Sequence, residues 1–314
     1  MSGRDKLTLL GYTAGWSAVR HLPDRAAYGA FRVIADRVWS RRGPSVQRLE
    51  ANLARAIGTT DDAAVREVSR EGMRSYLRYW CDTFRQPDWD TDRIVSRIRV
   101  EGEHFMRDPL AAGRGVVAAL PHMANWDHAG AWGCVTGAPV TTVAERLKPE
   151  RLFERFVAYR EGLGMEILPL TGGDSDVFTT LAARLREPRL VPLLADRDLS
   201  RRGIDVTLFG EATRMPAGPA VLALRTGSAL LPVSLWYEGV DPDHRLVVRF
   251  HEEIPPPADV RGAGRTAQVT QALADEFGRG IAAHPQDWHM LQPLFLADLP
   301  EDDSRRTVRR GAGR

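Results

Sequence analysis

Short apolar runs alternate with helix-length segments through the middle of this chain, and this alternation restricts its fold more than any other feature. The predicted strands are 115–120, 139–144, 165–170 and 190–195, and the predicted helices are 126–135, 149–162 and 175–186. Strands joined by helices of about ten or more residues require right-handed crossovers. We therefore predict an α/β fold, with a mainly parallel central sheet flanked by helices.

The pattern outside this region suggests how the rest of the chain is organised. Residues 206–209, 229–237 and 245–250 are typical of strands, and helices are predicted from 216–219 and over 265–283. Before residue 100 the periodicity is helical, with Leu49, Leu53 and Ile57 on one face. We predict a helical N-terminal cover at 1–99, an α/β core at 100–300 and a disordered polar tail at 301–314, all within one structural domain.

Composition excludes several classes of function. A net charge of +2 over 314 residues argues against a general nucleic-acid binder. The two cysteines, Cys81 and Cys134, offer neither a disulfide framework nor metal-ligand spacing, and they suit a reducing compartment. The histidines likewise show no metal-ligand pattern. We expect no metal and no cofactor.

The segment from Leu7 to Val19 is apolar and is flanked by Arg4, Lys6 and Arg20. It is shorter than the roughly 20 residues of a membrane-spanning helix. No convincing cleavage site follows it, which disfavours a signal peptide. Two interpretations stay open, an ordinary packed helix and an uncleaved helix lying in a bilayer interface.

His122 and Asp127 form the most suggestive motif. They stand five residues apart in Pro121-His-Met-Ala-Asn-Trp-Asp127, between the predicted strand 115–120 and the predicted helix 126–135. Open α/β sheets bind ligands at the carboxyl ends of their strands. A histidine there can move a proton near neutral pH, and Asp127 could hold its other ring nitrogen. The simpler alternative is a histidine satisfied by a local hydrogen bond.

Two further acids follow predicted strands. Asp196 follows the strand 190–195, so a parallel sheet returns it to the same edge as His122. It could cap a turn or raise the basicity of the imidazole. Glu145 also lies at a strand end. Arg214 precedes a predicted helix start, which suits either an anion site or simple capping.

The motif His122-x4-Asp127 after an apolar strand resembles the signature of the glycerolipid acyltransferases, and His-Met-Ala-Asn-Trp-Asp resembles the branch that contains the lipid A lauroyl acyltransferases. The resemblance extends from about Gly115 to Pro293. Further matching segments are 143–149, 160–164, 194–199, 209–219 and 284–289. The combination is most similar to members that acylate mannosylated phosphatidylinositol.

The resemblance implies transfer of a long-chain acyl group, such as palmitoyl, from acyl-CoA to a mannose hydroxyl. No metal or covalent acyl-enzyme is required. His122 would be the general base and Asp127 would orient it. The protein would be peripheral, on the cytoplasmic face of an anionic cell membrane. The alternatives are another acceptor, such as a lysophospholipid or a different glycolipid, and a lipid-binding protein without catalysis.

The resemblance also implies roles for further residues. Asp196 would be a third catalytic residue or would contact the acceptor hydroxyls, and Glu145 could accept hydrogen bonds from sugar hydroxyls. Glu145, Arg160, Arg197 and Arg214 would bind substrate, with Arg160 and Arg214 as candidates for the phosphates of CoA or lipid. Arginine suits phosphate recognition because its planar guanidinium matches the oxygens of the group.

Overall fold

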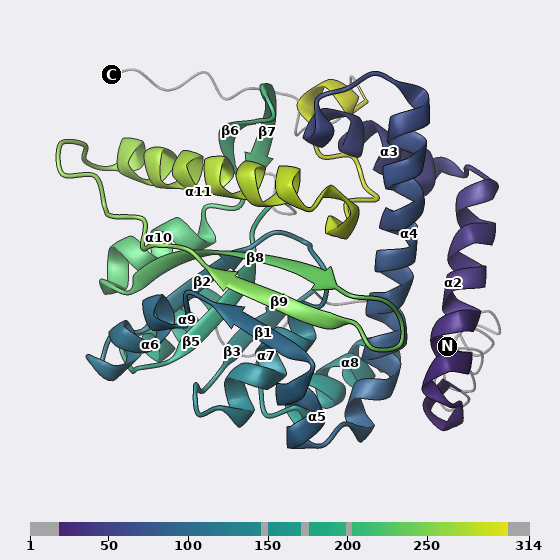
Figure 1. The fold of residues 1–314 in the computed structure, drawn as a ribbon. Helices are drawn as coiled ribbons and strands as arrows, with labels where there is room; N and C mark the ends of the chain where they lie inside the picture. The colour runs from purple at the N-terminus through teal and green to yellow at the C-terminus, as the bar shows by residue number, and fades with distance from the viewer. Residues whose placement is uncertain (1–18, 146–149, 171–175, 199–202, 301–314) are drawn as a thin grey trace.

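The computed structural model in Figure 1 describes residues 19–145, 150–170, 176–198 and 203–300. Most of the apolar segment at 7–19 and the whole tail at 301–314 therefore lie outside the described residues. In the part that is described, no helix is both long enough and apolar enough to cross a membrane.

Three helices precede the sheet: α2 (Asp24–Ser40), α3 (Pro44–Ile57) and α4 (Asp62–Arg85). Gly58, with φ of 65°, ends α3, and the Asp61 carboxylate caps α4 by accepting the N–H of Ala63. Figure 1 shows α4 running along one side of the core, with α2 packed on its outer face. The predicted helical character of this region is confirmed.

The central sheet has five strands in the order β1-β9-β8-β2-β5. Their bounds are β1 Ile98–Glu101, β2 Val116–Leu120, β5 Leu190–Leu194, β8 Ala229–Glu238 and β9 Arg245–Phe250. All neighbouring pairs are parallel except β8 and β9. The predicted α/β fold with a mainly parallel sheet is confirmed. Burial of β2 on both faces explains why its sequence is a continuous apolar run.

Helices cover both faces of this sheet. In Figure 1, α10 (Gly218–Thr226) and α11 (Ala263–Ala283) lie on one side, and α5 (Thr91–Ser96), α6 (Glu103–Ala111) and α7 (Trp126–Val135) lie on the other. Two further helices are α8 (Glu150–Gly162) and α9 (Val177–Arg184). A hairpin of β6 (Ile204–Leu208) and β7 (Glu211–Met215) stands apart from the main sheet. The remaining turns are η1 (Gln86–Asp88), η2 (Pro285–Asp287) and η3 (Leu296–Asp298).

Pro192 on β5 interrupts the hydrogen bonding between β5 and a separate parallel pair of strands. This pair is formed by β3 (Thr141–Ala144) and β4 (Glu166–Pro169). Strand β5 begins to pair with this unit, because the Leu190 N–H donates to the Pro139 carbonyl at 2.9 Å. The next backbone position that faces β3 is Pro192, which has no N–H. The Thr142 hydroxyl donates to the Pro192 carbonyl at 2.7 Å instead. The regular ladder ends there, and the two units separate.

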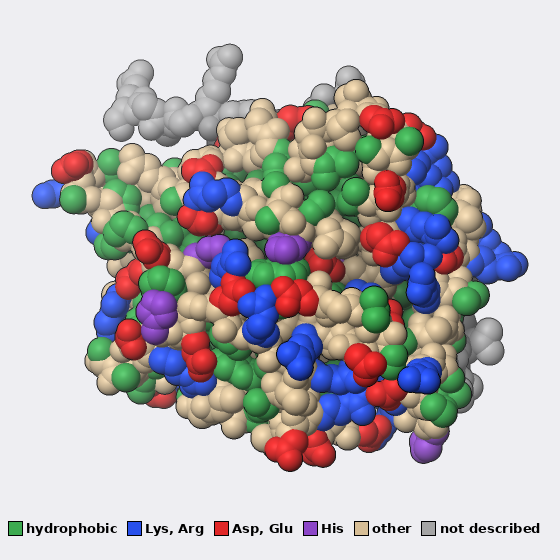
Figure 2. All heavy atoms as spheres, in the orientation of Figure 1, with side chains coloured by type: hydrophobic (Ala, Val, Ile, Leu, Met, Phe, Trp, Pro, Cys, Tyr) green, Lys and Arg blue, Asp and Glu red, His purple; other side chains and the backbone are tan. Residues whose placement is uncertain are grey.

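Basic and acidic side chains are mixed over the face seen in Figure 2. Ion pairs on strands of the sheet join Arg99 to Glu101 and Glu238, and Arg249 to Glu101. Such alternation gives no continuous basic surface on this face. It agrees with the small net charge of the whole sequence.

Candidate active site

The ring of His122 is held by Asp196. In the parallel register of β2 and β5, Leu120 is paired with Leu194, so the loops after the two strands lie side by side. The Nδ1 atom of His122 lies 2.5 Å from Oδ1 of Asp196, and the backbone N–H of His122 donates to Oδ2 at 3.0 Å. With its proton on Nδ1, the neutral ring carries its lone pair on Nε2. His122 is a quarter exposed and lines a cavity.

Asp196 is completely buried and remains a strong anion. Burial alone would raise its pKa, but the charge and hydrogen bonds of His122, together with the indole of Trp288, hold the pKa below its ordinary value. The carboxylate holds the ring in one orientation, with its proton on Nδ1. The arrangement therefore suits a histidine that accepts a proton through Nε2.

Asp127 faces a different partner. It is the second residue of α7, and its carboxylate accepts from Nε of Arg160 at 2.7 Å and from the Tyr79 hydroxyl at 3.0 Å. The expected contact of Asp127 with the ring of His122 is thus replaced by an ion pair. The first turn of α7 directs Asp127 toward α8 and α4, whereas the loop directs His122 toward β5. The pKa of Arg160, which burial would lower, is raised by Asp127.

Trp126 separates the two acids. Its ring lies edge-on to His122 with centroids 5.7 Å apart, and it stacks on Tyr79 at 4.5 Å. Asn125 caps α7 by accepting the N–H of His128 at 2.9 Å. Trp126 therefore forms a rigid wall beside the histidine. It is held there because the residue before it, Asn125, caps α7 and the residue after it, Asp127, is buried.

A cavity of about 650 Å³ opens beside His122. Thr142 on β3 and Pro192 on β5, which are hydrogen-bonded to each other, both line it. Most of its other lining side chains are apolar, among them Leu120, Met165, Phe178, Leu181 and Leu222. A cavity with this lining can enclose an apolar chain, and it places that chain next to His122.

Three of the four predicted substrate-binding residues, Glu145, Arg160 and Arg197, line the cavity with His122, and Arg214 is not part of this lining. Arg197 lies 3.8 Å from the carboxylate of Glu145. The other two arginines also contact carboxylates. Arg160 pairs with Asp127, and Nε of Arg214 on β7 lies 2.6 Å from Oδ1 of Asp205.

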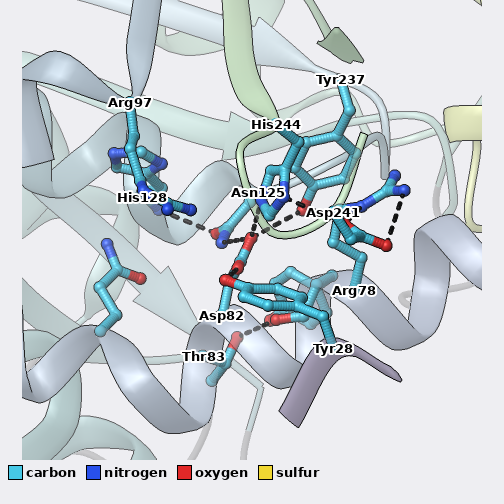
Figure 3. Close-up of polar contacts among 12 residues, drawn as sticks. Tyr28, Arg78, Asp82, Thr83, Arg97, Asn125, His128, Tyr237, Asp241 and His244 are labelled. Atoms are coloured by element: carbon cyan, nitrogen blue, oxygen red, sulfur yellow. Dashed lines mark hydrogen bonds and ion pairs between the residues drawn. The ribbon is translucent and has the colours of Figure 1, made fainter. Parts of the chain in front are cut away.

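A second polar network lies behind the site and was not foreseen from the sequence. Its centre is Asp82 on α4, which is buried and accepts hydrogen bonds from the hydroxyls of Tyr28 and Tyr237 and contacts Nε2 of His244 at 3.3 Å (Figure 3). Burial alone would raise the pKa of Asp82, but His244 lowers it. The network joins α2, α4 and the turn after β8, segments whose proximity no local sequence pattern indicates.

This network reaches the active-site loop through Asn125 and His128. The Asn125 amide lies 3.5 Å from Asp82, at the limit of a hydrogen bond. The Nε2 atom of His128 bonds the Ile94 carbonyl at 2.8 Å, and burial lowers the His128 pKa to about 4. His128 is thus a neutral structural histidine. Among the described residues, no cluster of His, Cys, Asp and Glu is arranged to hold a metal ion.

Comparisons with known proteins identify the relatives of this chain. The family model for bacterial lipid A biosynthesis acyltransferases matches residues 5–297. A phosphatidylinositol mannoside acyltransferase from Mycolicibacterium smegmatis is 46% identical over 306 residues, which cover 96% of this chain and 97% of the relative. The protein of the same name from Mycobacterium tuberculosis is 47% identical over 292 residues, 92% of this chain and 89% of the relative.

Proposed function

The chain belongs to the bacterial lipid A biosynthesis acyltransferase family, and we propose that it transfers a long-chain acyl group, most readily palmitoyl, from acyl-CoA to a mannose hydroxyl of a phosphatidylinositol mannoside. Family membership makes it an acyltransferase. The choice of acceptor is supported by the names of the relatives, whose matches cover nearly the whole chain. The observation that carries the proposed chemistry is the His122–Asp196 pair at the wall of an apolar cavity.

The proposed reaction is a direct transfer. Nε2 of His122 takes the proton of the mannose hydroxyl as its oxygen attacks the thioester carbonyl of acyl-CoA. The tetrahedral intermediate collapses, the C–S bond breaks, and the imidazolium returns the proton to the departing thiolate. Asp196 stabilises the imidazolium, because its carboxylate lies 2.5 Å from Nδ1 and is shielded from water.

Asp127 contributes differently in this proposal. Its ion pair with Arg160 and its bond to Tyr79 fix the first turn of α7, and this turn carries Trp126 against the ring of His122. Asp127 therefore orients His122 through the wall of the site. Arg160 acts together with Asp127, because the guanidinium of Arg160 is paired with the Asp127 carboxylate.

The cavity receives the acyl chain, and its polar rim receives the head groups. Glu145 accepts hydrogen bonds from mannose hydroxyls, and Arg197 faces phosphate oxygens of CoA or lipid. Arg214 is a further candidate for these phosphates, and it lines a smaller cavity together with Arg197. The donor is acyl-CoA, and no further cofactor takes part.

The acceptor lies in a bilayer, so the protein works at a membrane surface. We propose peripheral attachment to the cytoplasmic face of an anionic cell membrane through the apolar segment at 7–19 and its flanking cations. Acyl-CoA would then enter from the aqueous side while the mannosylated head group approaches His122.

Product analysis tests the proposal. The purified protein is incubated with palmitoyl-CoA and a panel of phosphatidylinositol mannosides, lysophospholipids and other glycolipids, and products are identified by mass spectrometry. We expect acylation of the mannosylated acceptors on a mannose. Transfer only to lysophospholipids would mean that the acceptor is a lysophospholipid and not a phosphatidylinositol mannoside. Lipid binding without transfer would refute the proposed activity.

A further inference from the structure

We propose that Trp288 is a positioning residue for acyl transfer, whose indole N–H holds the Asp196 carboxylate in place against the ring of His122. The proposal rests on the function proposed above and adds a residue from the C-terminal segment. Trp288 follows η2, far in sequence from both partners. Its indole N–H donates to Asp196, so it would act on the reaction through that carboxylate.

Three donors converge on Asp196. Nδ1 of His122 contacts Oδ1 at 2.5 Å, while the backbone N–H of His122 and Nε1 of Trp288 both donate to Oδ2 at 3.0 Å. Because the two donors on Oδ2 come from a backbone and a rigid indole, they fix the plane of the carboxylate. Oδ1 is then left to the imidazole.

The backbone around Trp288 is tied to the loop that carries His122. Met123 and Trp288 form an antiparallel bridge, the His289 N–H donates to the His122 carbonyl at 2.8 Å, and the Ala124 N–H donates to the Asp287 carbonyl at 2.9 Å. The indole and the imidazole therefore belong to one hydrogen-bonded unit. A shift of the C-terminal segment would move both.

Side chains from α4 hold this segment in turn. The Ser75 hydroxyl contacts Oδ1 of Asp287 at 2.5 Å and Nε2 of His289 at 2.9 Å, and all three side chains are buried. Although serine, histidine and aspartate are the residue types of a nucleophilic triad, this serine is 2% exposed and serves as an anchor. Ser75 thus fixes the position from which Trp288 reaches Asp196.

Packing alone does not account for a tryptophan at this position. Trp288 is fully buried and meets Phe209 edge-on with ring centroids 5.9 Å apart, contacts that a phenylalanine could largely make. Its one polar atom points to the one buried carboxylate that touches His122. A buried indole N–H needs a partner, and here that partner is Asp196.

Replacing the indole N–H tests the idea, and Trp288→Phe is compared with Trp236→Phe. Trp236 is also buried, and its Nε1 lies 3.3 Å from Glu238 on the outer part of β8, away from the cavity. We expect Trp288→Phe to lower kcat by about 10-fold or more, as loss of a hydrogen bond to a charged group would, with little change in KM for acyl-CoA. Trp236→Phe should retain the parent kcat.

The pH profile separates positioning from packing. A carboxylate that has lost a donor stabilises the imidazolium more strongly, so the acid limb of the rate profile should move to higher pH in Trp288→Phe. The other charged or titratable side chains around the pair are unchanged in this variant: Tyr79, Asp127, Glu145, Arg160, Asp176, Arg197, Asp198, Asp287 and His289. An unmoved acid limb with parent kcat would overturn the proposal.

Two further measurements test the proposal even if Trp288→Phe misfolds or if the proposed reaction is wrong. Benzothienylalanine at position 288 keeps the shape of the indole without its N–H, and it should reproduce the kinetics of Trp288→Phe. NMR of labelled histidine follows the ring of His122 without any turnover. Its titration should move upward in both variants relative to the parent, and equal titration curves would contradict the proposal even if the acceptor were different.

Discussion

The ring of His122 is bound by Asp196 and not by Asp127, although Asp127 is the nearer of the two in sequence. Nδ1 of His122 and Oδ1 of Asp196 lie 2.5 Å apart, whereas the Asp127 carboxylate is taken by Arg160 and Tyr79. The two acids of the site therefore do different work. In the proposed mechanism, Asp196 stabilises charge on the imidazole, and Asp127 fixes the first turn of the helix that forms one wall of the site.

Asp196→Asn should leave a folded protein with little activity. An amide can still accept from the backbone N–H of His122, but it cannot stabilise an imidazolium as a carboxylate does. We expect kcat for palmitoyl transfer to fall by about 100-fold or more. The assay is palmitoyl transfer to a phosphatidylinositol mannoside, with circular dichroism as the check on folding. A folded Asp196→Asn protein with parent kcat would remove Asp196 from the mechanism.

Asp127→Asn should affect stability as well as rate. It leaves the buried guanidinium of Arg160 without its counter-charge, which costs about 3–5 kcal/mol in comparable buried pairs. The double replacement Asp127→Asn with Arg160→Met removes both charges and should recover much of the loss. Urea unfolding of the three proteins measures this. Equal stability of the parent and the single variant would show that the ion pair contributes nothing.

The Gly130 position should control which acyl chains are used. A Cβ there would lie 2.7 Å from Sδ of Met165, and both residues line the cavity. In Gly130→Ala the methionine must shift, and space for the chain shrinks. We expect turnover of longer acyl-CoA donors to fall more than turnover of shorter ones. Gly29→Ala on α2, where a Cβ meets nothing within 4 Å, is the matched control. An unchanged ranking of donors would exclude this end of the cavity as the acyl site.

His128 should make stability fall in mild acid. Its pKa is lowered to about 4 in the folded protein, against an ordinary value of 6.5, so the unfolded chain binds the proton more tightly. Its contribution is present above pH 6.5 and is lost as pH falls toward 4, by up to about 3 kcal/mol. His128→Gln, which can still donate to the Ile94 carbonyl, should show a shallower fall in melting temperature over this range. Parallel curves for the two proteins would mean that His128 does not titrate in this way.

The sequence was sufficient to place His122 and Asp196. Both follow buried strands, and parallel strands bring their carboxyl ends to one edge. The direction of the Asp127 side chain could not be predicted, because a five-residue spacing across a loop does not fix where the first turn of a helix points. Its partners come from α8 and α4, which only the tertiary structure brings together.

Other features depended on packing in the same way. The hairpin strand β7 and the short β1 were missed because Glu211–Met215 and Ile98–Glu101 contain no long apolar run. The role of Trp288 depends on an antiparallel bridge to Met123. In contrast, the proline within the predicted strand 190–195 was a local signal that the ladder would be interrupted, and it marks where the cavity opens.

The most direct test of the whole account is the rate of palmitoyl transfer by His122→Ala. The variant removes the proposed base and leaves the cavity, the ion pair of Asp127 and the Trp288 bond to Asp196 in place. With palmitoyl-CoA and a phosphatidylinositol mannoside, acylated product is quantified by mass spectrometry beside the parent. The account predicts a loss of about 100-fold or more in kcat with the fold retained. Transfer at the parent rate would contradict it.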